Sequence, residues 1–303
     1  MDAHGKRLKR NIESNQQVSH AMNDTDIDDQ PGYVQRPVRR HRLGETRDAA
    51  DDVGQEWPVA LVYNGISHAV MMCTPRDLEA FAVGFSLTEG IVERGSDIHD
   101  IEVFFHDTPA GDTLPHAEVH LQVVQQAFVA MKQKRRALAG RTGCGVCGIE
   151  SIDLLDLQPE RVPETGFLSR LADDAIAHAA HELPAHQQLS KLTGGLHAAA
   201  WCDERGAVNY AFEDVGRHNA LDKLIGHLVL QRVDTTQGFV FLSSRASYEL
   251  VRKSARVGVP MLVTISAPTS LAISIAEKAG LRLVSFAREN GFVEYGRVDG
   301  ATR

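Results

Sequence analysis

The feature that most constrains the fold is a series of short apolar runs that alternate with capped helical stretches near the C-terminus. The runs cover residues 238–242, 261–265 and 281–286. Ser247 and Thr269 each precede a helical pattern, and their hydroxyl groups can accept hydrogen bonds from the first helical turn. Strands that alternate with helices over short connections pair in parallel, with right-handed crossovers. The sequence therefore predicts an α/β protein in which residues 166–303 form a domain around a parallel sheet.

A smaller α+β domain is expected over residues 57–128. Its Asn64-Gly65 dipeptide favours a hairpin turn between two strand-like runs, the first of which begins at Trp57. Thr74 and Pro75 are typical of a helix start, so a helix is expected after the second run. Two further strand-like runs follow this helix and complete the small domain.

The remaining segments are expected to lie outside the two domains. Residues 1–56 contain few large apolar side chains and show no apolar period. Such a segment buries too little surface to offset the entropy of ordering it, so a disordered tail is expected. Residues 129–165 are expected to form a basic linker that contains the Cys144-Gly145-Val146-Cys147 sequence.

Net charge and the distribution of apolar residues indicate which partners and which cellular compartment to expect. The formal net charge is −8, which gives no reason to expect a nucleic-acid partner. No run approaches the roughly 20 apolar residues that span a bilayer, and the N-terminus lacks the apolar stretch of a secretory signal. We therefore expect a cytoplasmic protein with no membrane partner.

Polar and basic side chains follow each of the three predicted C-terminal strands. The segments are 243–245 (Ser-Ser-Arg), 266–269 (Ser-Ala-Pro-Thr) and 287–291 (Ala-Arg-Glu-Asn-Gly). Ligands of open parallel sheets bind beyond the carboxyl ends of the strands, where helix amides and arginines can donate to phosphate groups. The alternative is that the hydroxyls only cap helices and the arginines are solvated. The joint pattern favours a nucleotide-like ligand.

Two more motifs could contribute to such a site. Residues 213–220 follow a predicted strand and open a predicted helix, so they could bind an anion or form a polar turn. Residues 193–197 contain two glycines that permit close approach of a ligand, although His197 could equally be a structural histidine. The GxGxxG spacing occurs only at residues 143–148, around the cysteine pair in the predicted linker, and no GxxxxGK[ST] sequence occurs. Neither a standard dinucleotide fold nor a P-loop is therefore supported.

Three functions compete for Cys144 and Cys147. A structural zinc site would need two more ligands, such as His106 or His116, and no second cysteine pair exists. A thioredoxin-like site should begin a helix, which the three neighbouring glycines disfavour. The remaining interpretation is a nucleophilic or sulfur-carrying cysteine on a flexible loop. Arg141 would favour its thiolate by lowering the cysteine pKa.

Taken together, these motifs resemble the FdhD family of formate dehydrogenase accessory sulfurtransferases. The matching residues are 63–65, 81–85, 141–148, 193–197, 213–223, 243–245, 266–269 and 286–288. They occur in this order across residues 57–297, and the N-terminal 56 residues lie outside the resemblance.

The resemblance implies an enzyme that receives persulfide sulfur from a cysteine desulfurase. It would pass the sulfur to the molybdenum bis(guanine dinucleotide) cofactor that formate dehydrogenase needs. Cys144 would bear the persulfide, with Cys147 as partner or alternative. The resemblance also implies a three-layer C-terminal domain similar to cytidine deaminase, a homodimer, and no tightly bound metal of the protein's own. The residues implied to contact the cofactor are Phe286, Ala287, Arg288, Glu289, Asn290, Gly291, Ser244, Arg245, Thr269, Arg217 and His218.

Deaminase chemistry is not expected despite the implied fold. The zinc deaminase signature has a His-x-Glu, whereas His197 is followed here by Ala198 and Ala199. The alternative function is a non-catalytic chaperone that binds the molybdenum cofactor or the apo-enzyme, with the cysteines incidental. That alternative predicts that Arg245 and Arg288 matter while a double cysteine variant still works.

Overall fold

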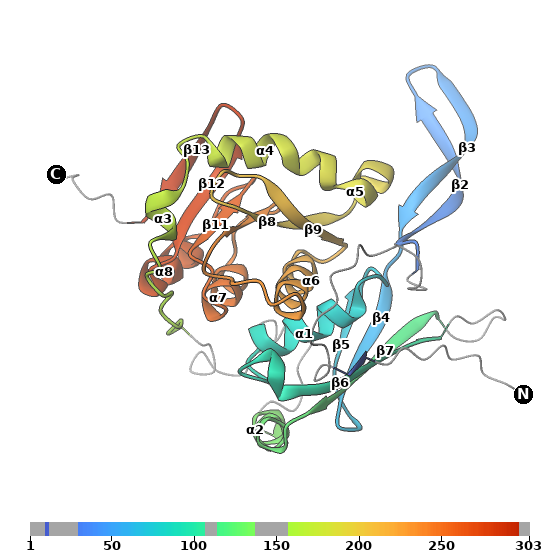
Figure 1. The fold of residues 1–303 in the computed structure, drawn as a ribbon. Coiled ribbons are helices and arrows are strands. Elements are labelled where there is room, and N and C mark those ends of the chain that lie inside the picture. The colour runs from blue at the N-terminus through green and yellow to red at the C-terminus, as the bar shows by residue number, and fades with distance from the viewer. Residues whose placement is uncertain (1–9, 12–29, 107–113, 137–156, 297–303) are drawn as a thin grey trace, which may run out of the picture.

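The computed structural model describes residues 10–11, 30–106, 114–136 and 157–296. These residues form two β-sheets, the helices that join and cover them, and a separate hairpin (Figure 1). The α/β class expected from the sequence is confirmed. In this part of the chain, no helix is long and apolar enough to cross a membrane.

The N-terminal sheet has five strands in the order β1-β6-β7-β4-β5. Their bounds are Arg10–Asn11 (β1), Trp57–Tyr63 (β4), Ile66–Cys73 (β5), Ile98–His106 (β6) and His116–Val123 (β7). Helix α1 (Leu78–Thr88) packs on one face, η1 (Gly95–Asp97) precedes β6, and α2 (Gln125–Arg136) follows β7. Alternate residues of the central strands, such as Val59 and Val119, are fully buried beneath α1, as period-2 patterning requires.

The helix expected after Thr74 and Pro75 begins later than these residues suggest. Its N-cap is Asp77, which has a left-handed backbone with φ of 54°, and none of the described side chains caps the helix. Thr74 does not cap because its groups bind another element: its backbone N–H donates to Asp214 Oδ2 at 2.9 Å, and its Oγ1 accepts from the N–H of Val215 at 3.1 Å. The cap-like sequence is therefore part of a tertiary contact.

The C-terminal sheet has six strands in the order β13-β12-β11-β10-β8-β9. The bounds are His197–Cys202 (β8), Val208–Asp214 (β9), Phe239–Leu242 (β10), Met261–Thr264 (β11), Arg282–Arg288 (β12) and Gly291–Tyr295 (β13). As the apolar runs predict, β10, β11 and β12 pair in parallel, whereas β8, β9 and β13 pair antiparallel with their neighbours.

Helices cover both faces of this sheet and make three layers (Figure 1). One face packs on α6 (Arg217–Leu230), α7 (Tyr248–Arg256) and α8 (Ser270–Ala279). The other face packs on α3 (Phe167–Arg170) and α4 (Ala175–His186), which leads into α5 (Gln188–Thr193). The central strands are buried on both sides, which explains why they are continuously apolar in the sequence.

Helices α1 and α6 join the two sheets through an unusually close backbone contact. A Cβ atom placed on Gly84 would lie 1.8 Å from the carbonyl oxygen of Asp222, and one placed on Gly226 would lie 1.8 Å from the carbonyl oxygen of Ala80. Each glycine therefore lets the other helix approach to backbone contact. The two halves of the chain are fixed to each other through this pair of helices.

The prediction of a disordered tail over residues 1–56 is wrong for residues 33–54. Strands β2 (Tyr33–Arg42) and β3 (Glu45–Gly54) form a hairpin that projects from the rest of the molecule (Figure 1). Arginines of β2 face aspartates of β3 across it, so Arg39 pairs with Asp48 and Arg40 with Asp51. Cross-strand ion pairs and backbone pairing thus replace the missing apolar side chains.

Candidate functional site

Three helices begin at the same edge of the C-terminal sheet, where β9, β10, β11 and β12 end. Strand β8 runs antiparallel to both of its neighbours, β9 and β10, so His197 at the start of β8 lies opposite Asp214 at the end of β9. The N–H of Ala198 donates to Ser243 Oγ at 2.8 Å, which places the start of β8 beside the end of β10. The amino ends of α6, α7 and α8 therefore bring partial positive charge to this edge. We call it the strand-end edge.

The expected strand-end residues lie on this edge, but several of their hydroxyl groups serve the fold. Thr269 Oγ1 accepts from the N–H of Ala272 at 3.2 Å and so caps α8. Ser244 is buried, and its hydroxyl donates to the carbonyl of Arg245 at 3.2 Å. Arg245 itself is exposed. The cap interpretation is thus correct for Thr269, while Arg245 extends from the edge.

Phe286 has a conformation that is rare for an aromatic residue. The pairing of β12 with β13 shifts between Ser285 and Arg288, and within this bulge Phe286 has φ of 55°. Its ring is turned out of the sheet and is 45% exposed. Strained backbone and an exposed aromatic ring at a strand end are typical of a site that contacts a ligand.

Arg288 and Glu289 take up separate positions after this bulge. Arg288 Nη1 donates to the carbonyls of Ile265 at 2.7 Å and Ala287 at 2.8 Å, which holds the guanidinium across the ends of β11 and β12. Glu289 instead faces α4, where its Oε1 lies 3.4 Å from Nδ1 of His181. Glu289 and Asn290 form the exposed turn, and Gly291 begins β13.

Arg217 is the strongest candidate anion ligand at the start of α6. Its Nε atom is buried and has no hydrogen-bond partner in the described part of the chain. Burial lowers the pKa of the neighbouring His197, and the Arg217 charge lowers it further. A neutral histidine beside an unsatisfied guanidinium nitrogen suits a site that accepts an anion.

His218 pairs with a carboxylate of the protein itself. Its Nε2 lies 3.6 Å from Oε2 of Glu249 in the first turn of α7. The nearby His218 ring, together with the polar groups of the first turn of α7, holds the pKa of Glu249 at about 2. Glu249 therefore occupies the space between the amino ends of α6 and α7 as an anion. His218 orients this carboxylate, so the contribution of His218 to ligand binding would be indirect.

The rest of the 213–223 motif is structural, which corrects the idea that it opens an anion site as a whole. Asp214 and Lys223 form a fully buried ion pair at 2.7 Å. Asp214 also accepts from the N–H of Gly216 at 2.8 Å and from Asn219 Nδ2 at 2.9 Å. Glu213 accepts from the first amides of α5 at 2.7 Å. The protein's own carboxylates thus satisfy donors that the sequence assigned to a ligand.

A second buried network, which sequence reasoning missed, joins α1, α6 and α7. Lys253 Nζ contacts Asp222 Oδ2 at 2.8 Å, Glu89 Oε1 at 2.8 Å and Thr88 Oγ1 at 2.8 Å. Arg252 contacts the other oxygen of Glu89 at 3.0 Å. A lysine within an otherwise apolar helix face is the only sequence signal for such a network, because apolar neighbours imply burial and a buried charge requires a partner.

The predicted catalytic residues Cys144 and Cys147, with Arg141, lie outside the described residues. The other two of the four cysteines are described, and both are buried. Burial raises the thiol pKa of Cys73 and of Cys202 well above its ordinary value, and the nearby carboxylates Asp214 and Asp203 raise it further. A protonated, inaccessible thiol is a poor nucleophile.

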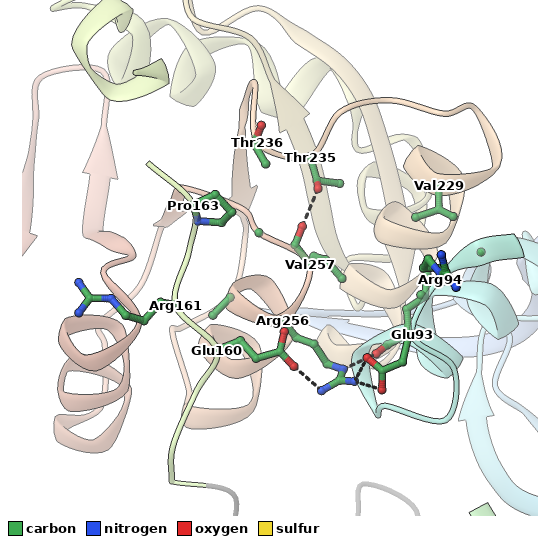
Figure 2. Close-up of a pocket in the computed structure, with 14 residues that line it drawn as sticks. Glu93, Arg94, Glu160, Arg161, Pro163, Val229, Thr235, Thr236, Arg256 and Val257 are labelled. Carbon is green, nitrogen blue, oxygen red and sulfur yellow. Dashed lines mark hydrogen bonds and ion pairs between the residues drawn. The ribbon is translucent and has the colours of Figure 1, made fainter. Parts of the chain in front are cut away.

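A cleft of about 480 Å³ lies at the other end of α7 (Figure 2). Arg256 crosses it and pairs with Glu160 at 2.7 Å and Glu93 at 3.1 Å. Helix α7 has nine residues, so the cleft is about 13 Å from the strand-end edge. None of the predicted site residues that the structure describes lines it, and Arg256 is already paired.

The fold and the strand-end edge define a two-sheet α/β protein with a candidate anion-binding edge. The chain matches the FdhD/NarQ family over residues 54–299 and belongs to that family. The resemblance drawn from the sequence motifs is therefore confirmed.

Named relatives extend over nearly the whole chain. A Burkholderia cenocepacia protein called Sulfur carrier protein FdhD is 74% identical over 282 residues, which cover 91% of this chain and 100% of the relative. A Chromobacterium violaceum protein with the same name is 58% identical over 277 residues, covering 91% and 99%. The fold is also similar to that of a solved formate dehydrogenase accessory protein from Desulfotalea psychrophila. The TM-score is 0.61 at 21% identity, and the match covers 89% of this chain and 99% of that one.

Proposed function

We propose that this chain is a sulfurtransferase that carries sulfur as a persulfide on Cys144 or Cys147. The sulfur would come from a cysteine desulfurase and go to the molybdenum bis(guanine dinucleotide) cofactor, a bound substrate here, for use by formate dehydrogenase. The names of the relatives at 74% and 58% identity support the sulfur-carrying role.

The observation that carries the proposal is the burial of the other cysteines. A persulfide carrier needs a thiolate that a donor protein can reach. Cys73 and Cys202 are each 0% exposed, and burial holds their thiols protonated by raising their pKa. Only Cys144 and Cys147 are left among the four cysteines of the chain.

The proposed transfer uses both cysteines, and its bonds and electrons are accounted for as follows. The Cys144 thiolate attacks the outer sulfur of the donor's Cys–S–SH group, so a new S–S bond forms while the donor thiolate leaves. The Cys147 thiolate then attacks the inner sulfur of the Cys144 persulfide and releases HS⁻ toward the molybdenum. Two electrons pass from the cysteine pair to the released sulfur, and a Cys144–Cys147 disulfide forms. A cellular dithiol reductant restores the two thiols.

The strand-end edge supports binding of the cofactor. A guanine dinucleotide carries a pyrophosphate. Arg217 Nε, which has no hydrogen-bond partner among the described residues, and the amino ends of α6 and α8 are suitable donors to it. The exposed Phe286 ring offers a surface on which a base can stack. Arg245 and Arg288 add positive charge at the rim. Ser244, Thr269 and the 287–291 turn shape the backbone around it.

We also propose that the protein acts as a homodimer in the cytoplasm, as the family resemblance implies. A reducing compartment suits this chemistry because free thiolates persist there. Sedimentation of the purified chain would test the dimer: a species of twice the 33.2 kDa chain mass supports it, and a monomer at micromolar concentration contradicts it.

The first experiment maps sulfur onto the four cysteines. The purified chain is incubated with a cysteine desulfurase and free cysteine, and the masses of its peptides are measured by mass spectrometry before and after reduction. We expect one reducible sulfur on the peptide that holds Cys144 and Cys147, and none on the peptides of Cys73 and Cys202, which serve as internal controls.

Variants then separate the carrier from a chaperone. Cys144→Ala and Cys147→Ala should each abolish maturation of formate dehydrogenase while leaving the fold intact. If no sulfur is added although the donor charges another acceptor, and the double cysteine variant still supports maturation, the carrier is refuted and a cofactor-binding chaperone takes its place.

A further inference from the structure

The pairing of β6 with β7 brings two histidines and a glutamate together on the sheet face opposite the α1 core. His106 ends β6 and lies directly opposite His116, the first residue of β7. Glu118 lies two residues farther along β7 and therefore on the same face. One nitrogen or oxygen atom from each of the three lies within 4.8 Å of the other two. All three side chains are partly buried rather than fully solvated.

The hydrogen bonds leave coordinating atoms available. His116 Nδ1 lies 3.1 Å from the carbonyl oxygen of Leu114, so it carries the proton and leaves the Nε2 lone pair unused. His106 Nε2 is buried without a hydrogen-bond partner in the described part of the chain. The two rings stack with centroids 4.6 Å apart and planes 15° from parallel. A cation would satisfy both imidazole lone pairs.

The third ligand is held by a neighbour on the same strand. His120 Nε2 lies 2.8 Å from Glu118 Oε2, and the His120 ring packs edge-on against Phe104 with centroids 4.9 Å apart. A histidine that positions a ligating carboxylate is the arrangement that metal sites use to orient their ligands. One carboxylate oxygen of Glu118 stays available for a cation.

We propose that His106, His116 and Glu118 form a binding site for a divalent transition-metal ion of the Zn²⁺ class. Two imidazoles and one carboxylate are a donor set that Zn²⁺ accepts, and a three-residue set leaves one coordination position open to water or a thiolate. Ligand distances of about 2.1 Å put tetrahedral ligand atoms about 3.4 Å apart, so modest side-chain rotations close the site. This site is separate from the sulfur-carrying cysteines and differs from the expectation that the protein holds no metal.

The test uses the full chain without an affinity tag and with Cys144→Ala and Cys147→Ala, so that no accessible cysteine pair competes. Zn²⁺ is titrated against a chromogenic chelator, and Co²⁺ is added separately for its visible absorption. We expect one equivalent of tightly bound Zn²⁺ and a Co²⁺ spectrum without a thiolate charge-transfer band. His106→Gln and His116→Gln should each weaken binding at least about tenfold.

Two further variants keep the result interpretable. Glu118→Gln removes the carboxylate charge with almost no change in shape, and it should also weaken binding. His99→Gln changes an exposed histidine on the same strand β6 and should leave the affinity unchanged. The proposal is overturned if the cysteine-free chain binds no Zn²⁺. It is also overturned if the variants at His106, His116 and Glu118 bind as tightly as His99→Gln.

Discussion

Replacing Lys223 by methionine is expected to destabilise the protein by about 3 kcal/mol. Lys223 Nζ lies 2.7 Å from Asp214 Oδ2, and both side chains are fully buried. Removing one partner of a buried ion pair costs about 3–5 kcal/mol because the other charge is left uncompensated. Asp214 keeps three donors at 2.8–2.9 Å, from Thr74, Gly216 and Asn219, so the lower end of that range applies.

The same substitution also removes contacts that join the two sheets. Lys223 Nζ donates to the carbonyl of Thr74 at 3.0 Å, between β5 and α1, and lies 3.4 Å from the carbonyl of Glu213. Methionine has nearly the same length and fills the space, so the loss is one of charge and hydrogen bonding rather than of volume. The effect should therefore spread to the contact between α1 and α6.

The assay is urea unfolding followed by circular dichroism and by tryptophan fluorescence. Lys191→Met, at an exposed position of α5, is the matched control and should change the free energy of unfolding by less than about 0.5 kcal/mol. A double-mutant cycle with Asp214→Asn should give a coupling energy of at least about 1 kcal/mol. The reasoning is refuted if Lys223→Met lies within about 1 kcal/mol of the parent chain, or if the two substitutions are additive.

Three further tests probe separate parts of the structure. Gly84→Ala should lower the free energy of unfolding by more than about 3 kcal/mol, because its Cβ would lie 1.8 Å from a backbone oxygen of α6. Gly195→Ala, which has open space around it among the described residues, should be nearly neutral. Equal urea midpoints for the two variants would contradict this prediction. Phe286→Gly should be more stable than Phe286→Ala by about 1 kcal/mol, because glycine adopts φ of 55° without strain and alanine does not. If the alanine variant unfolds at the higher temperature, the backbone strain is absent. Burial alone would raise the pKa of Glu89, but the charges of Lys253 and Arg252 lower it to about 2. Glu89→Gln should therefore be less stable than the parent chain by its full amount above about pH 4.3, and the difference should vanish as the pH falls toward 2. A difference that persists at pH 2 in denaturation curves would refute the assignment.

Local patterns in the sequence predicted the C-terminal sheet well. The runs at 238–242, 261–265 and 281–286 became β10, β11 and β12, and the parallel pairing follows from their alternation with α7 and α8. Thr269 caps α8 as its position suggests. These features depend on residues near one another in the chain, so composition and spacing are sufficient to indicate them.

Long-range contacts decided what the polar motifs do. Thr74 and Pro75 look like a helix start, yet Thr74 contacts Asp214 and Val215, about 140 residues away. Residues 213–223 look like an anion site, yet Asp214 and Lys223 form a buried ion pair, and both also contact Thr74 of the N-terminal half. The charged β2–β3 hairpin shows no apolar period, so its sequence predicts disorder, whereas its order comes from pairing between the two strands.

The sequence alone determined the family likeness, the parallel core and the pair of cysteines proposed to carry sulfur. Tertiary structure alone decided that Cys73 and Cys202 are buried and that His106 lies opposite His116. It also decided that Arg217 Nε has no hydrogen-bond partner in the part of the chain that the structure describes. The physical reason is that burial and strand register depend on which distant segments pack together. A residue's chemistry therefore follows from neighbours that its own stretch of sequence does not contain.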